Sequence, residues 1–462
     1  MPQTPEKCGP ALGIELDGDR EHYWPGDVIT GHVHRQAPTV CPTATVMIML
    51  HGRAKSKSVV PGHRNSEHRG EFTLINSPKT VKTLFSGPIH IAADGGGQNK
   101  WRFSVPLPPH VELGGGRYCT ESFLSIEPSS VAQDELPPSF EVGWTGDLDE
   151  AFVEYYLEAG LRQDAKGSKG TYTAIKPIRI LRFNPGSSIT SNKVKRHDTE
   201  LTVSSFHLEP SLKNAKLSRS QKVKKVFGTP SVPSLTFKVE VGAPTVIQAD
   251  DPNPFQFSLR AIPQWDQSSK SLRDVPQTLQ LTSLDVNIWT IVEVKTEQRR
   301  PIGGGENGWK FATSLDTNKA LKSLSSPIEL YCSNDSPTID VGKIFNFKIP
   351  QYLTRPADSR WHEFVRPGVV TYNIKITNQL KWEMEFKIAG EIAKVDGKGD
   401  LEVLWPPREA FVRPPTGIPA GSNQSLVIPL IEDENPPTFR EVQEEDRQAG
   451  REPVTGNVGE KS

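Results

Sequence analysis

Apolar and polar residues alternate along most of the chain, with the period of two that is typical of β-strands buried on one face. Trp101, Phe103 and Val105 share one face, for example, while Arg102 and Ser104 lie on the other. The same alternation recurs in residues 12–16, 153–159, 178–180, 237–241, 284–294, 345–349, 372–376 and 384–388. The pattern predicts strands at these positions, each packed against a partner sheet on one face and facing water on the other, as in a β-sandwich.

Two segments near the start sharpen this picture. Residues 44–50 read ATVMIML and are apolar on both faces, which predicts a central strand covered on two sides. Before them, Pro25, Gly26 and Asp27 predict a tight turn, because proline suits its first central position, glycine its left-handed position and aspartate can cap the bend. The β-branched residues of the run 28–33 then favour a strand directly after the turn.

Length and composition suggest how these strands are divided among domains. The chain has 462 residues with 40 prolines and 37 glycines, which suits many short strands and turns. We expect an all-β protein with two sandwich domains, over residues 1–185 and 233–431, joined by a basic Ser- and Lys-rich linker at 186–232. The acidic, polar tail 432–462 is expected to be disordered, because it is nearly free of aromatic residues.

Charge and cysteine content bear on location and partners. The formal net charge of −1 gives no reason to expect nucleic acid as a partner. Cys8, Cys41, Cys119 and Cys332 are scattered without metal-binding spacing, which predicts free thiols in a reducing compartment. The first residues lack the charged and apolar regions of a secretory signal, and no apolar run approaches the ~20 residues of a membrane span. We therefore expect a cytoplasmic protein.

Signals of catalysis or of cofactor binding are weak. The chain has no Gly-x-Ser-x-Gly elbow, and its triple-glycine runs lack the Gly-Lys-Ser/Thr ending of a phosphate loop. His32 and His34 share a strand face, but no acidic residue or cysteine lies at an informative spacing nearby in the sequence. We expect no catalytic residue, no cofactor and no metal site. One alternative stays open: two carboxylates from distant strands would make a β-sandwich carbohydrate-active hydrolase.

Several segments, taken in order, resemble the N-terminal domain of arrestin-like proteins. The opening phrase 23–33 fits the pattern Tyr-x-Pro-Gly-Asp-x-(Ile/Val)-x-Gly-x-Val, and residues 52–57, 103–108, 136–140 and 153–159 follow in the order and spacing of that domain. The resemblance covers roughly residues 12–183, and the second half matches more loosely, mainly at 368–374.

This resemblance implies an arrestin fold, which consists of two immunoglobulin-like β-sandwiches joined by a linker. It also implies a non-catalytic adaptor that binds the cytoplasmic tails of membrane-protein cargo, transiently at the plasma membrane or endosomes, and links that cargo to ubiquitin-ligase or endocytic trafficking machinery. A retromer-type coat subunit shares the two-sandwich architecture and remains an alternative.

The chain looks closer to the α-arrestins, or arrestin-related trafficking adaptors, than to the visual arrestins, because residues 12–17 lack a phosphate-sensing lysine pair. α-Arrestins recruit HECT ubiquitin ligases through Pro-Pro-x-Tyr motifs that dock on WW domains. The nearest match in the tail is Pro436-Pro437-Thr438-Phe439. Phenylalanine in place of tyrosine removes one hydroxyl hydrogen bond, worth about 0.5–1.5 kcal/mol. Pro436, Pro437 and Phe439 are therefore candidate contacts for a WW-domain ligase.

A second candidate surface is basic. Arg53, Lys55 and Lys57 project from one strand face at a spacing of two, with Arg64 and Arg69 in the loop expected after it. Each cation near an anionic lipid surface contributes about 1 kcal/mol to binding. We expect these three residues to contact acidic lipid or phosphorylated tails, so that alanine at all three would weaken partner binding and leave thermal stability nearly unchanged. The alternative is an edge strand that its lysines protect from aggregation.

Overall fold

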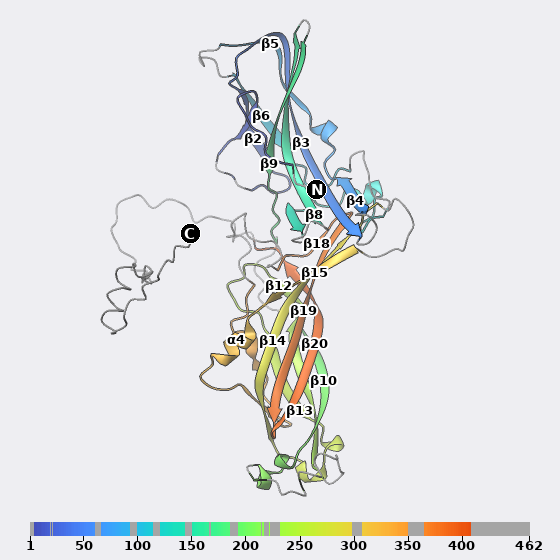
Figure 1. Cartoon of the computed structure of the whole chain (residues 1–462), viewed down its shortest axis with the longest axis vertical. Coiled ribbons are helices and arrows are strands. Elements are labelled where there is room, and N and C mark those ends of the chain that lie inside the picture. Colours follow the sequence, from blue (N-terminus) through green and yellow to red (C-terminus); the bar gives the residue numbers. More distant parts are fainter. Residues whose placement is uncertain are drawn as a thin grey trace, which may run out of the picture. The chain divides into compact units, whose positions relative to one another are not determined.

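The computed structural model describes residues 4–18, 20, 22–60, 66–92, 99–113, 121–143, 150–165, 168–184, 193–213, 215, 216, 221, 232–297, 307–349 and 365–407. Strands account for most of this part of the chain, and its helices are single short turns or little more (Figure 1). The predicted all-β class is therefore confirmed. All the described residues belong to one compact unit, residues 1–411, inside which two buried cores form.

The first half builds two antiparallel sheets. Their strands are β1 Gly13–Leu16, β2 Val28–Arg35, β3 Thr39–Val60, β4 Ser66–Thr73, β5 Lys82–Ile91, β6 Asn99–Pro106, β7 Phe140–Gly143, β8 Glu150–Ala165 and β9 Ser168–Ile178. The smaller sheet has the order β1-β2-β6. The larger has the order β4-β3-β8-β7, with β5 also on β3 and β9 also on β8. Apolar residues of both sheets, such as Ile29 and Leu50, share the first core.

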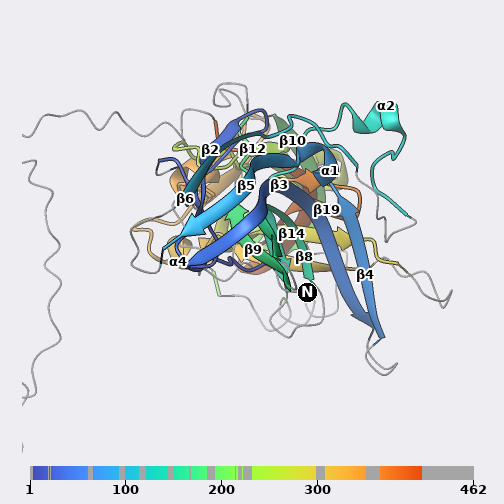
Figure 2. The same ribbon diagram turned by 90° about the horizontal axis from the view of Figure 1, so that it is seen from above.

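Strand β3 lies in the middle of the larger sheet, as the run 44–50 predicted, but only one of its faces is fully covered, because Thr45, Met47 and Met49 are half-buried. It pairs with β8 over residues 44–57, while β5 takes the other edge of its first part and β4 that of its last part. Figure 2 shows β4 and β5 beside the two ends of β3. The predicted turn is also present: Gly26 has φ 89°, and the Asp27 backbone N–H donates to the Trp24 carbonyl at 3.0 Å.

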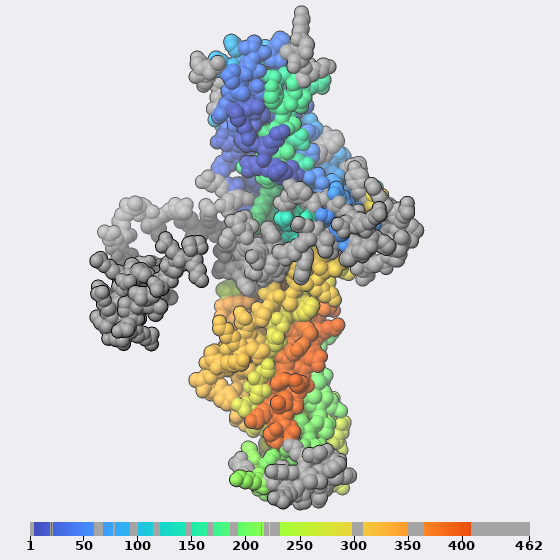
Figure 3. Space-filling model, viewed as in Figure 1, coloured from blue at the N-terminus to red at the C-terminus, as the bar shows by residue number. Residues whose placement is uncertain are grey.

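The second half builds two further sheets. Their strands are β10 Val194–Ser204, β11 Ser234–Pro244, β12 Val246–Gln248, β13 Ser258–Pro263, β14 Gln277–Val294, β15 Asn307–Ser314, β16 Glu329–Cys332, β17 Ile339–Asp340, β18 Val369–Val370, β19 Ile374–Ile388 and β20 Glu391–Leu404. One sheet has the order β10-β11-β13-β17 and the other β12-β20-β19-β14-β15, with β16 on β14 and β18 on β19. In Figure 3, β14, β19 and β20 form yellow to orange bands on the face in view.

Residues of these two sheets share the second core, whose largest fully buried side chain is Trp382 on β19. Gly397 on β20 leaves room for it, because a Cβ there would lie 2.5 Å from the Trp382 ring. The helices are α1 Ser77–Thr80, α2 Pro128–Val131, α4 Thr317–Lys322 and α5 Val341–Ile344, with 3-10 turns η1 Phe206–Leu208, η2 Pro210–Leu212, η3 Trp265–Gln267 and η4 Lys270–Leu272. Each half therefore has one smaller and one larger sheet around a buried core, which is compatible with the expected pair of sandwiches.

The structure corrects three expectations for the second half. Residues 345–349 are not a strand: helix α5, capped by the Asp340 side chain, leads into a turn in which Asn346 has φ 53°. Residues 374–376 and 384–388 belong to one continuous strand, β19, whereas Tyr372 and Asn373 of the predicted strand 372–376 lie in a bend before it. Strand β10 lies inside the expected linker 186–232 and pairs with β11 along its whole length. The sequence rule failed there because β10 is exposed on most of its positions and so resembles a loop in composition.

Candidate functional site

The basic residues Arg53, Lys55 and Lys57 lie on one face of β3, as their spacing predicted. They do not lie on an edge strand, because β3 has β4 on one side and β8 on the other over residues 53–57. Arg69 belongs to β4 rather than to a loop, and it lies opposite Lys57 in the ladder. Arg64 lies outside the described residues.

Carboxylates on the two neighbouring strands neutralise this face. Arg53 Nε donates to Glu154 Oε1 at 2.5 Å, and Arg53 Nη1 lies 3.7 Å from Glu71 Oε1. Lys55 Nζ lies 3.4 Å from Glu71 Oε2. The Arg53 and Lys55 side chains are only 23% and 13% exposed, so both cations are largely withdrawn from solvent. A partner would have to break these ion pairs to reach them.

The N-terminal segment closes the network around Glu154. The backbone N–H of Thr4 donates to Glu154 Oε2 at 2.7 Å, and Arg53 Nη2 donates to the Thr4 hydroxyl at 2.7 Å. Glu154 is only 7% exposed, and the cost of burying its charge is offset by the guanidinium and these donors. Arg53, Glu154 and Thr4 are therefore structural contacts between distant parts of the chain.

The same sheet face continues toward His51. Its imidazole stacks on the Tyr156 ring, with 4.7 Å between the ring centroids, and its Nε2 lies 3.1 Å from Glu158 Oε2. Burial lowers the pKa of His51, against the opposing effect of the Glu158 carboxylate. Burial likewise raises the pKa of Tyr156, over whose ring the Arg53 guanidinium lies at 5.5 Å.

Sequence reasoning missed Glu71 and Glu154 because neither is near Arg53 along the chain. Glu154 is 101 positions away, and only the β3–β8 register places it opposite Arg53. A prediction of strand pairing would have found it. The candidate tail residues Pro436, Pro437 and Phe439 lie outside the described residues.

A second polar cluster forms where the two halves of the chain meet, which we call the junction. Seven apolar residues of the second half are buried in the first core: Val292, Val294, Phe311, Val369, Tyr372, Ile374 and Ile376. The Tyr372 ring stacks on Phe72 of β4 with 5.3 Å between centroids, and its hydroxyl donates to Asp134 Oδ2 at 2.7 Å. The two cores are thus connected by buried apolar surface.

Asn373 and Ser56 are fully buried at the centre of the junction. The Asn373 amide donates to Ser56 Oγ at 3.0 Å, and Ser56 Oγ donates to the Lys295 carbonyl at 2.7 Å. Three separate segments are therefore held by one pair of polar side chains.

Gly70 of β4 is required for this close approach. A Cβ at this position would lie 2.4 Å from the Lys295 carbonyl oxygen and 2.5 Å from Ser56 Oγ. One residue earlier, the Arg69 carbonyl accepts a backbone hydrogen bond from Glu297 N–H at 2.9 Å. The chain after β14 therefore extends along β4 and leaves no space for a side chain at Gly70.

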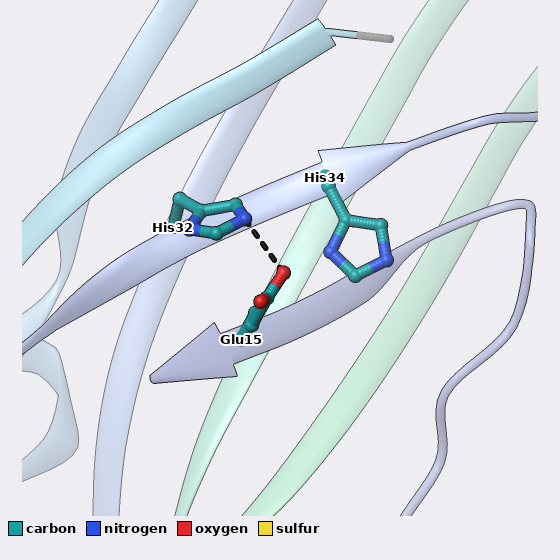
Figure 4. Close-up of side chains that lie close together, drawn as sticks. All are labelled: Glu15, His32 and His34. Carbon is teal, nitrogen blue, oxygen red and sulfur yellow. Dashed lines mark ion pairs between the residues drawn. The ribbon is translucent and has the colours of Figure 1, made fainter. Parts of the chain in front are cut away.

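A third cluster lies on the smaller sheet of the first half, where β1 and β2 place Glu15 next to His32 and His34 (Figure 4). His32 Nε2 lies 2.9 Å from Glu15 Oε2, and one ligand atom from each of the three residues lies within 4.8 Å of the other two. Burial is the main reason that the pKa of His34 is lowered, and His32 adds to the effect. The sequence did not reveal this cluster, because only the β1–β2 register places Glu15 opposite His32.

Cys8, Cys41 and Cys332 are free thiols, as predicted, and Cys119 lies outside the described residues. Burial raises the pKa of the Cys332 thiol to about 12, so it remains protonated and unreactive at neutral pH. In the part of the chain that the structure describes, no helix is long and apolar enough to cross a membrane.

No protein-family model matches the chain, and a search of curated proteins found no match.

Proposed function

We propose that the chain is a non-catalytic, arrestin-like adaptor in the cytoplasm. One surface binds the cytoplasmic tails of membrane-protein cargo, transiently at the plasma membrane or endosomes. Another surface, or the tail, recruits a WW-domain HECT ubiquitin ligase or endocytic machinery.

The observation that carries this proposal is the junction. Two β cores of similar construction are joined by buried apolar side chains and by the Asn373–Ser56 hydrogen bond. Neighbouring domains move relative to one another by default unless the interface is large and hydrophobic. A junction of this kind favours a protein that presents surfaces of both halves together, which is what an adaptor for two partners requires.

Three of the segments on which the resemblance rests form a turn or strands, as their residue patterns predict. The phrase 23–33 forms the turn and most of β2, residues 103–106 lie in β6, and 153–159 lie in β8. These placements support the proposal, since each segment occupies the kind of element that its pattern implies.

The alternative of a carbohydrate-active hydrolase requires a pair of carboxylates. Glu71 and Glu154 both form ion pairs with Arg53, which does not suit the roles of acid and nucleophile. A surface depression in the second half contains a single carboxylate, that of Asp251, and is lined by Ile247, Gln248, Asp251, Asn253, Phe255, Lys348 and Ile349.

Proximity labelling in cells tests the proposal. The full chain is expected to label plasma-membrane or endosomal proteins together with a WW-domain ligase. Phe439→Tyr, which restores Pro-Pro-x-Tyr, should strengthen ligase labelling by up to roughly tenfold, as expected for one hydroxyl hydrogen bond. Phe439→Ala should weaken it and leave cargo labelling unchanged.

Three results would contradict the adaptor proposal. Labelling of proteins from other compartments alone would contradict the proposed binding of membrane-protein cargo. Turnover on a glycan panel that a single carboxylate substitution abolishes would favour the hydrolase. A partner that copurifies in fixed ratio under all conditions would favour a coat subunit.

A further inference from the structure

We propose that Glu15, His32 and His34 form a binding site for one divalent transition-metal ion, with Zn²⁺ as the ion that the ligands suit best. The sequence-based expectation was no metal site, because no carboxylate lies near the two histidines along the chain. Strand pairing supplies that carboxylate, since Glu15 of β1 lies directly opposite His32 of β2.

The three side chains converge on one point. Both imidazoles leave β2 on the same side, and the Glu15 carboxylate reaches toward them from β1 (Figure 4). The ligand atoms lie within 4.8 Å of one another, whereas a tetrahedral zinc ion with bonds of about 2.0–2.1 Å needs separations of roughly 3.3 Å. Small side-chain rotations of exposed Glu15 and of the rings would close this difference.

The nitrogens that face the site are available to a metal. His34 Nδ1 and His32 Nε2 are shielded from solvent, and neither has a hydrogen-bond partner among the residues that the structure describes. The contact of 2.9 Å between His32 Nε2 and Glu15 is an ion-pair distance without hydrogen-bond alignment. Buried polar atoms normally have partners, and a bound ion would satisfy both nitrogens at once.

Gly13 sets the orientation of the second ring. It lies opposite His34 in the ladder, and a Cβ there would lie 2.5 Å from both Cε1 and Nε2 of the imidazole. The ring therefore lies across the β1 backbone, and its Nδ1 edge is left for the site. An alanine at residue 13 would displace the ring without removing a ligand.

Two imidazoles and one carboxylate are a donor set that suits zinc, and three protein ligands leave one coordination position open to water or to a partner. The charged neighbours oppose very tight binding. Arg102 and Lys100 of β6 lie opposite His32 and His34, although both side chains are exposed and extend into solvent. The Glu15 side chain is 60% exposed, so the ion can enter directly from solvent.

Isothermal titration of the full chain with ZnCl₂ tests this site. We expect one specific site per chain, with affinity reduced more than about 100-fold by His32→Gln or His34→Gln and about 10- to 100-fold by Gly13→Ala. His90→Gln, which removes an exposed histidine on β5, is the matched control and should leave the affinity unchanged. MgCl₂, which prefers oxygen ligands, should not compete.

Thermal unfolding distinguishes a lost site from a lost fold. The wild-type chain should be stabilised by Zn²⁺, and each ligand variant should unfold at the metal-free wild-type temperature whether or not Zn²⁺ is present. X-ray absorption of the zinc complex should report two imidazole ligands. Zinc binding that the His32 and His34 variants leave intact, or no zinc binding by the wild-type chain, would overturn the proposal.

Discussion

Strands β3 and β2 each carry polar side chains at alternate positions on one face, yet the two faces differ in what lies opposite them. On β3, Arg53 faces Glu154 and Lys55 faces Glu71, so the cations are neutralised within the sheet. On β2, His32 and His34 face Glu15 and Gly13, and His32 Nε2 and His34 Nδ1 have no hydrogen-bond partner among the described residues. The difference teaches that the pairing register, rather than the spacing along one strand, decides whether a polar face stabilises the fold or can bind a ligand.

Removing Arg53 should have the largest effect on stability. Arg53→Ala leaves the Glu154 carboxylate buried with only Thr4 as its partner, so we expect a loss of about 3 kcal/mol in the free energy of unfolding. Urea denaturation measures it. Arg102→Ala on the exposed face of β6 is the control, with an expected change within about 0.5 kcal/mol. Equal effects of the two substitutions would show that the β3 face is not structural.

A larger side chain at the junction should have the next largest effect on stability. It tests the close contact of β4 with Lys295 and Ser56. Gly70→Ala forces the Lys295 carbonyl and Ser56 apart, at an expected cost of about 1–3 kcal/mol. Hydrogen exchange should quicken at the Lys295 and Glu297 amides, which donate within the junction. Gly143→Ala on β7 is the matched control, because nothing lies within 4 Å of its Cβ position. Unchanged exchange in Gly70→Ala would mean that the junction tolerates separation.

A substitution of Lys57 can test partner binding by the β3 face with little effect on stability. It lies opposite Glu150 and Arg69, near the end of the paired part of β3, where charge pairs contribute little. Lys57→Ala should change the free energy of unfolding by less than about 1 kcal/mol. Cosedimentation with phosphatidylserine vesicles then reports its role in lipid binding. A loss of stability as large as that of Arg53→Ala would remove the distinction between the two positions.

The smallest effect concerns pH. Because burial lowers the folded-state pKa of His51 below its ordinary value of 6.5, protonation favours the unfolded chain. The contribution of His51 is therefore complete above pH 6.5 and decreases as the pH falls below that value. His51→Gln should reduce the stability lost between about pH 7 and about pH 5.5 in urea denaturation. An identical pH dependence in His51→Gln and in the wild-type chain would contradict this assignment.

Local patterns were sufficient for most of the fold. Alternation located β6, β8, β11 and β14, and the turn residues Pro25 and Gly26 located the start of β2. Local patterns failed where a strand is exposed on most of its positions, as in β10, and where alternating phenylalanines pack around a turn, as at Phe345 and Phe347. The candidate sites needed more than local patterns, because Glu15, Glu71 and Glu154 meet the histidines and cations only across the strand ladders.

A double-mutant cycle on Arg53 and Glu154 tests most directly whether the basic face of β3 belongs to the fold. The free energies of unfolding of the wild-type chain, Arg53→Ala, Glu154→Gln and the double variant give the coupling between the two side chains. We expect a coupling of at least about 1.5 kcal/mol, as for residues in one buried ion-pair network. Effects that are additive within about 0.5 kcal/mol would contradict a coupling between Arg53 and Glu154. Arg53 would then be a candidate for partner binding.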